Sequence, residues 1–421
     1  MRFSLGVVIA VCLACGAVAA PFAYGPYGGA PTAETVVVSW SSDTPLPARV
    51  EYGTLSEYDV SGTLSEMLDV PLDDSSTLKI VSVTLSTLAP NTTYVYRVVL
   101  LAQDGEVESP LGRFVTAPPP GQTIRFAVVS DTQWQWEGDN RLEVVGDAIA
   151  QDETSFDFIL HAGDIVESPA TTYWDHWFAS FGDMLLKAPF IPVLGNHENS
   201  HRSYYENFTL PPGGGKNDER WWALHWGDVV VVGLDSTNLK VADYIAQQEW
   251  ARFHLSGSEP HKFVVFHYPV FSSDAFHGDG YSYDVIFHPI FVETGVDIVF
   301  NGHAHNYERI ERDGVVYLVV GGGGAVPRAL ADTLVEGSIV ATEGYNFYTS
   351  VTASASGIDV DVISVAQASD DIFVPTDGHL LDAFSLSDAD VSSTSAASWS
   401  LILVALLGAV IAGLLLVRAL K

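Results

Sequence analysis

Polar clusters with the side chains of metal ligands are spread along the middle of this 421-residue sequence. Each cluster directly follows an apolar run. In order they are Asp131-Thr132-Gln133, Gly163-Asp164, Gly195-Asn196-His197-Glu198, His267 and Gly302-His303-Ala304-His305. Carboxylates, an amide oxygen and imidazoles suit Mn, Fe or Zn, and one carboxylate can bridge two ions about 3.5 to 4 Å apart. The pattern therefore predicts a site for two metal ions.

The apolar runs before these clusters are strand candidates that alternate with helix-length segments. They are Ile124–Ser130, Phe156–His161, Phe190–Leu194, Val229–Leu234, Phe263–Phe266 and Val296–Phe300. This rhythm is typical of a layered α/β domain, in which the carboxyl ends of the strands meet in one crevice. Taken singly, an Asp after a strand is usually a helix cap and Gly-Asn is usually a turn. The ordered set is what predicts a joint site.

The preceding segment, from Glu34 to Thr116, has a different pattern. Short alternating, β-branched runs such as Val36–Trp40, Leu78–Leu85 and Tyr94–Leu101 are separated by Pro, Gly, Asn and Asp turns. We expect an antiparallel sandwich of roughly 90 residues. Pro118-Pro119-Pro120-Gly121 then marks a stiff linker and a domain boundary.

Both ends of the chain are apolar. The first 20 residues resemble a secretory signal peptide, with a short membrane span as the alternative. Near the other end, a Ser-rich stalk precedes Trp399–Val417, an uncharged stretch long enough for a transmembrane helix. The basic residues Arg418 and Lys421 would stay cytoplasmic, so the sequence predicts a single-pass, membrane-anchored protein at the cell surface with its bulk outside.

Composition narrows the chemistry and the partners. Both cysteines, Cys12 and Cys15, lie in the expected signal peptide, so metal ligands must be oxygen and imidazole nitrogen. A lipid on Cys15 is an alternative. The chain has 52 acidic and 19 basic residues, which argues against nucleic acid as a partner. The partners expected are a phosphate-ester small molecule and the membrane, and the oligomeric state stays open.

The ordered motifs resemble the calcineurin-like metallophosphoesterase superfamily over Ile124–Leu386. Tyr307-Glu308-Arg309 and the front domain, with Val50-Glu51-Tyr52-Gly53 and Pro90–Tyr94, are similar to the purple acid phosphatase branch. The resemblance implies a four-layer α/β/β/α sandwich behind a fibronectin type III-like β-sandwich. The expected division is a signal peptide (1–20), sandwich (21–117), catalytic domain (118–386), stalk (387–398), transmembrane helix (399–417) and cytoplasmic tail (418–421).

The resemblance also implies roles for single residues. One ion would be held by Asp131, Asp164 and His305, with Gln133 left open as a ligand, and the other by Asp164, Asn196, His267 and His303. Asp164 bridges the ions, and a water between them loses a proton and attacks phosphorus. His197 is implied as the catalytic group at the leaving-group oxygen, with an orienting role for a ligand as its alternative. Glu198, Glu308, Arg309 and Trp134 are candidates for support of the ligands or for contact with substrate, and the loop histidines His201, His277 and His288 are weaker candidates.

Two positions depart from the family pattern. Purple acid phosphatases have a tyrosine three residues after the Gly-Asp aspartate, and its iron charge-transfer band gives their colour. Glu167 stands there in this chain, so we expect a colourless enzyme. Many other members have a histidine where this chain has Gln133. The first ion should therefore be held less tightly than the second.

The leading hypothesis is an extracellular phosphomonoesterase that uses a metal-bridging hydroxide and two Fe, Mn or Zn ions. The first alternative is a phosphodiesterase or nucleotide pyrophosphatase of the same fold. The second alternative is a surface binding protein that has lost its chemistry. Ligand types fill all of the expected metal positions, which favours an enzyme. The natural substrate depends on loops that match no motif.

Overall fold

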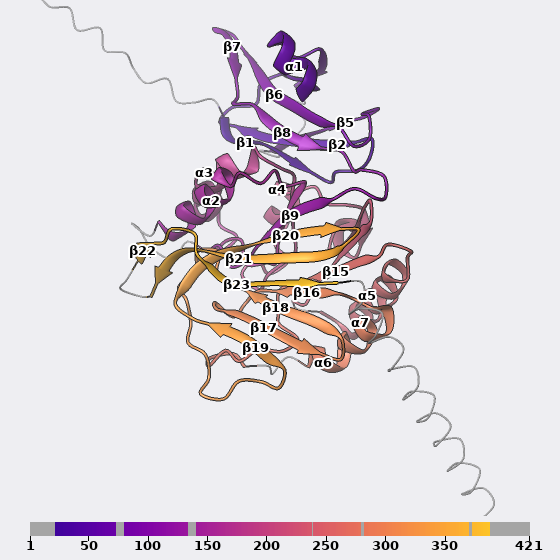
Figure 1. Cartoon of the computed structure of the whole chain (residues 1–421). Helices are drawn as coiled ribbons and strands as arrows, with labels where there is room; N and C mark the ends of the chain where they lie inside the picture. The colour runs from indigo at the N-terminus through magenta and orange to yellow at the C-terminus, as the bar shows by residue number, and fades with distance from the viewer. Residues whose placement is uncertain are drawn as a thin grey trace, which may run out of the picture.

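The computed structural model describes residues 22–72, 80–133, 140–237, 239–278, 282–369 and 373–387. Its N-terminal part is a sandwich of two antiparallel sheets (Figure 1). One sheet has the order β1-β2-β5, with β1 at Phe22–Gly29, β2 at Val36–Ser42 and β5 at Ile80–Leu85. The other has the order β4-β3-β6-β7, and β8 also pairs with β6. Its strands are β3 (Ala48–Thr54), β4 (Glu66–Val70), β6 (Thr93–Ala102), β7 (Gly105–Glu108) and β8 (Gly112–Val115), with the short helix α1 (Leu55–Ser61) after β3.

The sandwich core forms because alternate residues of its strands face the partner sheet. Val36, Val38 and Trp40 of β2 are fully or almost fully buried, and they share one apolar cluster with Val50 of β3 and Tyr96 of β6. This is the period of two expected for strands with one buried face.

The larger body contains two sheets that stack face to face. The first has the order β11-β10-β9-β20-β21-β22, and β23 pairs with β21. Its parallel half is β9 (Ile124–Val129), β10 (Phe158–His161) and β11 (Phe190–Pro192). Its antiparallel half is β20 (Tyr345–Ser354), β21 (Gly357–Ala368), β22 (Phe373–Pro375) and β23 (Leu380–Leu386).

The second sheet has the order β12-β13-β14-β15-β16-β18-β17-β19. Its parallel centre is β14 (Val229–Gly233), β15 (His261–Val265), β16 (Ile298–Asn301) and β18 (Val315–Val320). Antiparallel strands flank this centre: β12 (Gly213–Gly214), β13 (Trp221–Trp226), β17 (Tyr307–Arg312) and β19 (Ser338–Thr342).

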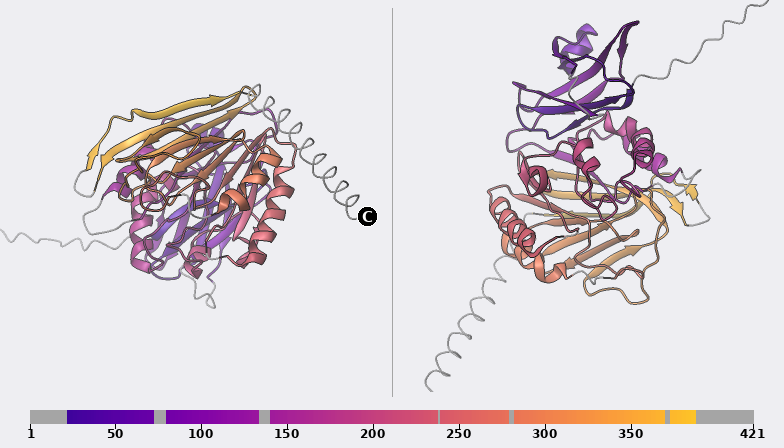
Figure 2. Two further views of the ribbon diagram at one scale, coloured as in Figure 1. Left: turned by 90° about the horizontal axis from the view of Figure 1, so that it is seen from below. Right: turned by 180° about the vertical axis from the view of Figure 1, so that it is seen from behind.

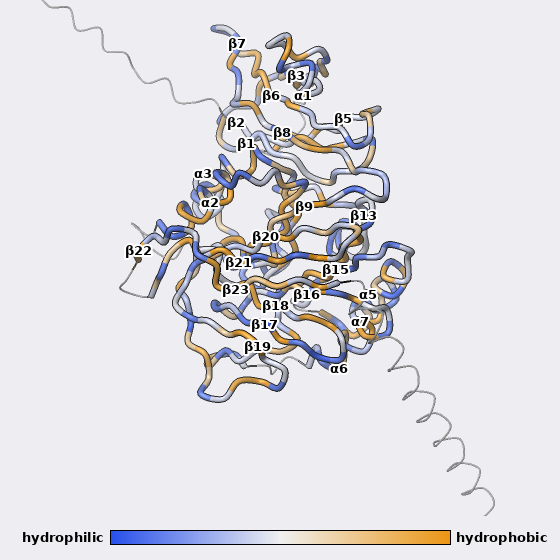
Figure 3. Tube along the Cα trace, in the orientation of Figure 1, coloured by the Kyte–Doolittle hydropathy of each residue, from blue (hydrophilic) through white to orange (hydrophobic). Residues whose placement is uncertain are grey.

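Helices cover the outer face of each sheet. The helices α2 (Arg141–Gln151) and α3 (Thr171–Leu185) lie on one side, and α5 (Val241–Leu255), α6 (Tyr283–Ile286) and α7 (His288–Thr294) lie on the other (Figures 1 and 2). The inner faces meet through Phe126, Phe263 and Phe300, whose rings pack edge to face across the two sheets. The central strands carry much of the hydrophobic colour in Figure 3. The result is the expected α/β/β/α layering.

The sandwich is attached to the body through β1. Tyr24 stacks on Phe178 of α3 with ring centroids 4.3 Å apart, and Tyr27 lies 5.3 Å from the same ring. The Tyr27 hydroxyl also donates to the backbone carbonyl of Asn207, at the end of α4 (Arg202–Asn207). These contacts fix the sandwich beside α3 and α4.

The predicted fold class needs one correction, which concerns the membrane. In the part of the chain that the structure describes, no helix is long and apolar enough to cross a bilayer. The expected transmembrane helix at 399–417 lies outside the described residues, as do the expected signal peptide and most of the stalk. Among the described residues the structure supports a β-sandwich and an α/β body, and nothing there supports the C-terminal transmembrane helix or the membrane as a partner.

Candidate metal centre

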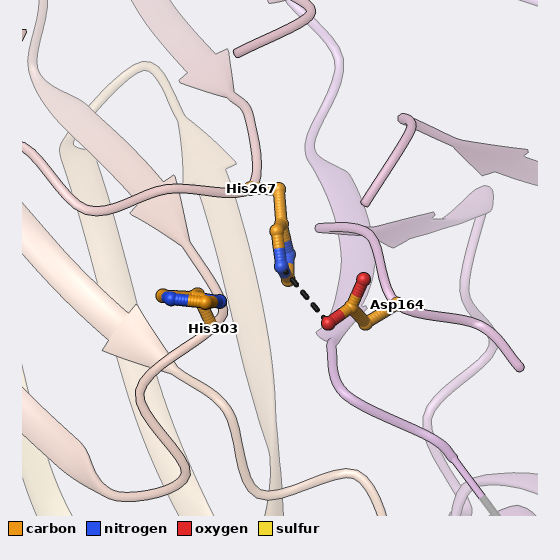
Figure 4. Close-up of side chains that lie close together, drawn as sticks. All are labelled: Asp164, His267 and His303. Carbon is orange, nitrogen blue, oxygen red and sulfur yellow. Dashed lines mark ion pairs between the residues drawn. The ribbon is translucent and has the colours of Figure 1, made fainter. Parts of the chain in front are cut away.

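The candidate ligands come from the carboxyl ends of strands in both sheets of the body. Asp131, Asp164 and Asn196 follow β9, β10 and β11 of the first sheet. His267 follows β15 of the second sheet, and His303 and His305 follow β16. Figure 4 shows His267 and His303 together on one side of the group and Asp164 across from them, with a dashed line joining His267 to Asp164. The stacking of the sheets, and not proximity in sequence, brings these groups together.

Asp164, His267 and His303 form the centre of the group. Their ligand atoms all lie within 4.8 Å of one another, and the three residues are buried. The Nε2 atom of His267 lies 3.1 Å from the Oδ2 atom of Asp164 and 3.1 Å from the Oδ1 atom of Asn196. A carboxylate, an amide oxygen and two imidazoles at this spacing suit a first-row transition metal or zinc.

Asp131 and His305 lie beside this centre as a second ligand pair. The Nε2 atom of His305 is 3.5 Å from the Oδ1 atom of Asp131. The backbone N–H of His303 donates to the Asp131 carboxylate, with nitrogen-to-oxygen distances of 2.9 and 3.0 Å. This bond links the second pair to the first group.

The backbone at the ligands is strained. Asp131, Asp164 and His303 have φ angles of 58°, 55° and 70°, a region that costs about 1 to 3 kcal/mol for each residue that is not glycine. Such strain persists where the surrounding structure enforces it, and it clusters at functional sites.

Glycines allow the ligand loops to approach one another. A Cβ atom on Gly195 would lie 2.0 Å from the Asp164 backbone nitrogen, and one on Gly302 would lie 2.1 Å from the Ser130 Oγ atom. Any side chain at these positions would separate Asp164 from Asn196, or His303 from Asp131. This close approach explains why a glycine precedes each of these ligand motifs.

The electrostatics of the group favour a cation between the ligands. Burial alone would raise the pKa of Asp164, but His267 and His197 hold that pKa well below its usual range. Burial lowers the pKa of His267, and the stronger attraction of Asp164 raises it to about 9. Burial, together with the charge of His267, depresses the pKa of His303. An ionised Asp164 and a neutral His303 both offer electron pairs to a cation where the ligand atoms converge.

Gln133 is placed as an additional oxygen ligand would be. Its amide nitrogen donates to the Oδ2 atom of Asp164 at 3.1 Å, whereas its buried Oε1 atom has no hydrogen-bond partner among the described residues. A buried carbonyl oxygen without a partner is costly unless something else satisfies it. This oxygen fits a cation at the same site.

His197 lies at the rim of the site and is half-buried. Its Nδ1 atom is 2.7 Å from the backbone carbonyl of Glu167, and its Nε2 atom is 3.8 Å from the Oδ2 atom of Asp164. The carbonyl fixes the proton on Nδ1, so the other ring nitrogen faces the ligands. Burial lowers the pKa of His197, but Asp164 and Glu167 raise it overall.

The Glu198 carboxylate joins the loop that carries Asp164 to the loop that carries Asn196. This buried carboxylate accepts hydrogen bonds from the backbone N–H groups of Asp164, Ile165, Val166 and Gly195, at 2.8 to 3.1 Å. It therefore contacts the backbone of the ligand loops and none of their side chains.

The remaining predicted residues lie further out. Glu308 is buried and accepts from Ser273 and Ser338, so it holds the loop after His267. Arg309 pairs with Asp382 and Glu311 and lies over the Phe384 ring. Their charges are thus used in structural contacts. Trp134 lies outside the described residues.

Sequence analysis missed Arg328 and gave little weight to His277. The ring centroids of His277 and His303 lie 3.9 Å apart, and the Nη1 atom of Arg328 contacts the Nε2 atom of His277. Neither residue belongs to a ligand motif. No sequence motif marks Arg328. It becomes a candidate only in the structure, where its loop follows β18, a strand next to β16 in the sheet.

Comparison with known proteins agrees with this geometry. The family described as calcineurin-like phosphoesterase matches residues 124–307, and the family described as purple acid phosphatase, N-terminal domain, matches residues 27–116. Together the two matches cover more than half of the chain. The first spans all of the ligand motifs, and the second spans most of the sandwich.

Individual relatives are more distant. Purple acid phosphatase 1 of Ipomoea batatas is 28% identical over 231 residues, covering 49% of this chain and 48% of that protein. Phosphoenolpyruvate phosphatase of Allium cepa is 25% identical over 325 residues, covering 71% of this chain and 64% of that protein. The chain thus spans about half to two thirds of the length of these relatives.

Among solved structures, the purple acid phosphatase PPD1 from yellow lupin (Lupinus luteus) seeds has the same fold. Its TM-score is 0.69, with 19% identity over 87% of this chain and 75% of the lupin chain. The fold, the ligand motifs and the two family matches agree. This chain carries a calcineurin-like phosphoesterase domain, matched over residues 124–307, behind a purple acid phosphatase N-terminal domain, matched over residues 27–116.

Proposed function

We propose that this protein is a metal-dependent phosphoesterase that hydrolyses phosphate monoesters. The observation that carries the proposal is the convergence of Asp164, His267 and His303 within 4.8 Å inside the calcineurin-like phosphoesterase match. That family implies divalent metal ions. When bound, the ions supply an activated water between them and neutralise the charge on the phosphoryl oxygens.

The candidate ligands fall into two sets, one for each ion. By the family resemblance Asp164 would bridge the ions, whereas Asn196, His267 and His303 would hold one ion and Asp131 and His305 the other. Gln133 would add its unpartnered carbonyl oxygen to the site. The ion identity within Mn, Fe and Zn stays open because oxygen and nitrogen ligands accept all three.

His197 would stabilise or protonate the oxygen of the leaving group. Its Nδ1 atom is fixed on the Glu167 carbonyl, so the ring presents Nε2 toward the site. A positioned proton donor typically contributes about 10² to 10⁴-fold to a rate. The His197 side chain keeps 29% of its surface exposed, so a substrate can reach it.

Monoesters are preferred over diesters in this proposal because of the relatives. One is named as a purple acid phosphatase and another as a phosphoenolpyruvate phosphatase, whose named substrate is a phosphate monoester. A diesterase of the same fold is the second candidate. Action outside the cell is also part of the proposal, and it rests on the signal-like sequence at residues 1–20 alone.

The test uses the full chain supplied with Mn, Fe or Zn in turn. Bound metal is measured by mass spectrometry, and hydrolysis of a chromogenic monoester is compared with that of a diester. Asn196→Ala should lose turnover, while Gln248→Ala on α5 serves as the control because its amide contacts Ile286 on the outer face. Less than one metal per chain and no turnover would contradict the proposal. Turnover of the diester alone would favour the second candidate.

A further inference from the structure

Arg328 is connected to the ligand group through two contacts. Its backbone N–H donates to the His305 carbonyl at 2.8 Å, and its guanidinium contacts the Nε2 atom of His277. The His277 ring in turn lies 3.9 Å from the ring of the candidate ligand His303. The guanidinium therefore stands at the edge of the metal site, in contact with a side chain that packs against the candidate ligand His303.

The loop that carries Arg328 does not need the arginine side chain to hold its shape. Asp274 forms an antiparallel bridge with Leu330, the Ala275 N–H donates to Ala329 at 2.9 Å, and the Ala331 N–H donates to Ser273 at 2.7 Å. These backbone bonds join residues 273–275 to residues 329–331. The side chain of Arg328 extends from a loop that is already fixed.

His277 is also held independently of Arg328. The Asp274 carboxylate accepts hydrogen bonds from the backbone N–H groups of Phe276 and His277, at 3.0 and 2.6 Å. The guanidinium can only donate hydrogen bonds, so the His277 nitrogen that it meets acts as an acceptor. The contact orients Arg328 without neutralising its charge.

The charge of Arg328 is uncompensated among the described residues. No carboxylate there pairs with it, and its other side-chain contact is with the ring of Phe276, 5.3 Å away and largely exposed. By contrast, Arg220 and Arg309 form ion pairs with aspartates. In a chain with a net charge of −33, an arginine without a carboxylate partner beside a metal site is a binding group for an anion.

We propose that Arg328 forms a subsite for a second anionic group of the substrate, a phosphate or a carboxylate, next to the phosphoryl group at the metal site. The inference rests on the proposed function and makes it more specific. Because Arg328 contacts His277, which in turn packs against His303, the guanidinium would meet a group next to the phosphoryl group bound at the ligands. The preferred substrates then carry two anionic groups a few bonds apart.

The first test measures binding and requires no turnover. Methylenediphosphonate and methylphosphonate, which this chemistry does not hydrolyse, are titrated into the metal-loaded full chain by calorimetry. Arg328→Gln should weaken binding of the diphosphonate about 10-fold or more and binding of the monophosphonate less than about 2-fold. Only the diphosphonate gains a charge-assisted hydrogen bond from the guanidinium. The affinity of Arg328→Lys for the diphosphonate should lie between those of the wild type and Arg328→Gln, because lysine keeps the charge and loses the planar guanidinium.

Arg252→Gln is the matched control. Arg252 lies on α5 and pairs with Glu293, so neither phosphonate should bind differently to this variant. Equal weakening of both phosphonates by Arg328→Gln would overturn the subsite, and so would no change in either.

The second test separates the subsite from the proposed function. For the wild type, kcat/KM is compared for pyrophosphate and for a chromogenic monoester with an uncharged leaving group. Arg328→Gln should lower the ratio of the two values about 10-fold, mainly through KM. If the wild type hydrolyses both but the variant leaves the ratio unchanged, the subsite is wrong. If the wild type hydrolyses neither, the proposed function itself fails, while the phosphonate titration still tests anion binding.

Discussion

His267 and Asp164 meet across the two sheets of the body, with Nε2 of the histidine 3.1 Å from Oδ2 of the aspartate. One follows β15 and the other follows β10, and the sheets to which these strands belong pack through their phenylalanine faces. The contact therefore depends on both sheets at once. The Nδ1 atom of His267 is fixed by the Ala162 carbonyl at 3.0 Å, which points Nε2 at the site.

The variant Asp164→Asn should lose metal. The amide keeps the size of the carboxylate but removes the charge that faces His267 and His197. We expect bound metal to fall below one ion per chain and activity to fall by more than about 100-fold, the upper range for residues that only support ligands. Metal analysis and turnover of a chromogenic monoester are the measurements. Asp313→Asn, on an exposed turn beside His288, should change neither.

Replacement of His197 should separate catalysis from metal binding. His197→Asn should keep both ions and lower kcat about 100-fold. The loss should be larger for an alkyl phosphate than for a nitrophenyl phosphate, because an alkoxide leaving group needs the proton and a nitrophenolate does not. His201→Asn is the control, since Asn can still cap α4. An equal loss for both leaving groups would argue against proton donation by His197.

Glu198→Gln should destabilise the protein and loosen the site. The carboxylate accepts four backbone N–H groups, and an amide cannot accept all of them. We expect the free energy of unfolding, measured in urea, to fall by about 2 to 4 kcal/mol, and metal binding to weaken. Glu206→Gln removes only a surface pair with Arg202 on α4 and should cost less than about 0.5 kcal/mol. Similar values for the two variants would refute a supporting role for Glu198.

The colour of the iron form should depend on Glu167. This residue occupies the position of the tyrosine that colours purple acid phosphatases, and its buried Oε2 atom has no hydrogen-bond partner in the part of the chain that the structure describes. We expect the iron-loaded wild type to lack a visible charge-transfer band. Glu167→Tyr should introduce one. Absorption spectra of both proteins with matched iron content provide the check, and a coloured wild type would show that another residue supplies the band.

A pH-dependent contribution to stability is expected in the N-terminal sandwich. Burial would raise the pKa of Glu51, but hydrogen bonds from Arg97 and Arg49, at 2.8 Å each, outweigh burial and lower it. Because the folded-state pKa lies below the unfolded value, the stabilisation is present above about pH 4.5 and is lost as the pH falls through the lowered pKa. Glu51→Gln should therefore cost about 1 to 2 kcal/mol at pH 7.

At a pH below the lowered pKa of Glu51, the wild type and Glu51→Gln should unfold alike. Thermal unfolding of the two proteins across the pH range tests this. Glu106→Gln, at the more exposed end of the Arg49 contact, is the control and should have little effect at any pH. A difference between the wild type and Glu51→Gln that does not change with pH would rule out the charge as its cause.

The parallel strands of the body were predictable, but the antiparallel strands that join them in the first sheet were not. The predicted strands at Ile124–Ser130 and Val229–Leu234 differ from β9 and β14 by one residue at one end. Buried parallel strands are short continuous apolar runs, which a sequence shows directly. β20, β21 and β23 were not predicted, because a strand that joins a sheet formed much earlier in the chain pairs with residues that its own local pattern does not specify.

The sequence by itself determined the ligand types, their order and their positions after apolar strands. It determined the two-part organisation too, because alternation with a period of two gives way to buried strands separated by helices. These features depend on backbone geometry within a few residues, so they can be read locally.

Only the tertiary structure decided which side chains face the site. The sequence singled out Arg309 as a candidate for substrate contact, yet Asp382 on β23 pairs with that arginine. It did not single out Arg328, which stands beside His277 at the edge of the ligand group. Whether an arginine is available to a substrate depends on which carboxylates lie near it in space. The packing of the two sheets and the pairing of distant strands set those neighbours, and no spacing along the chain encodes them.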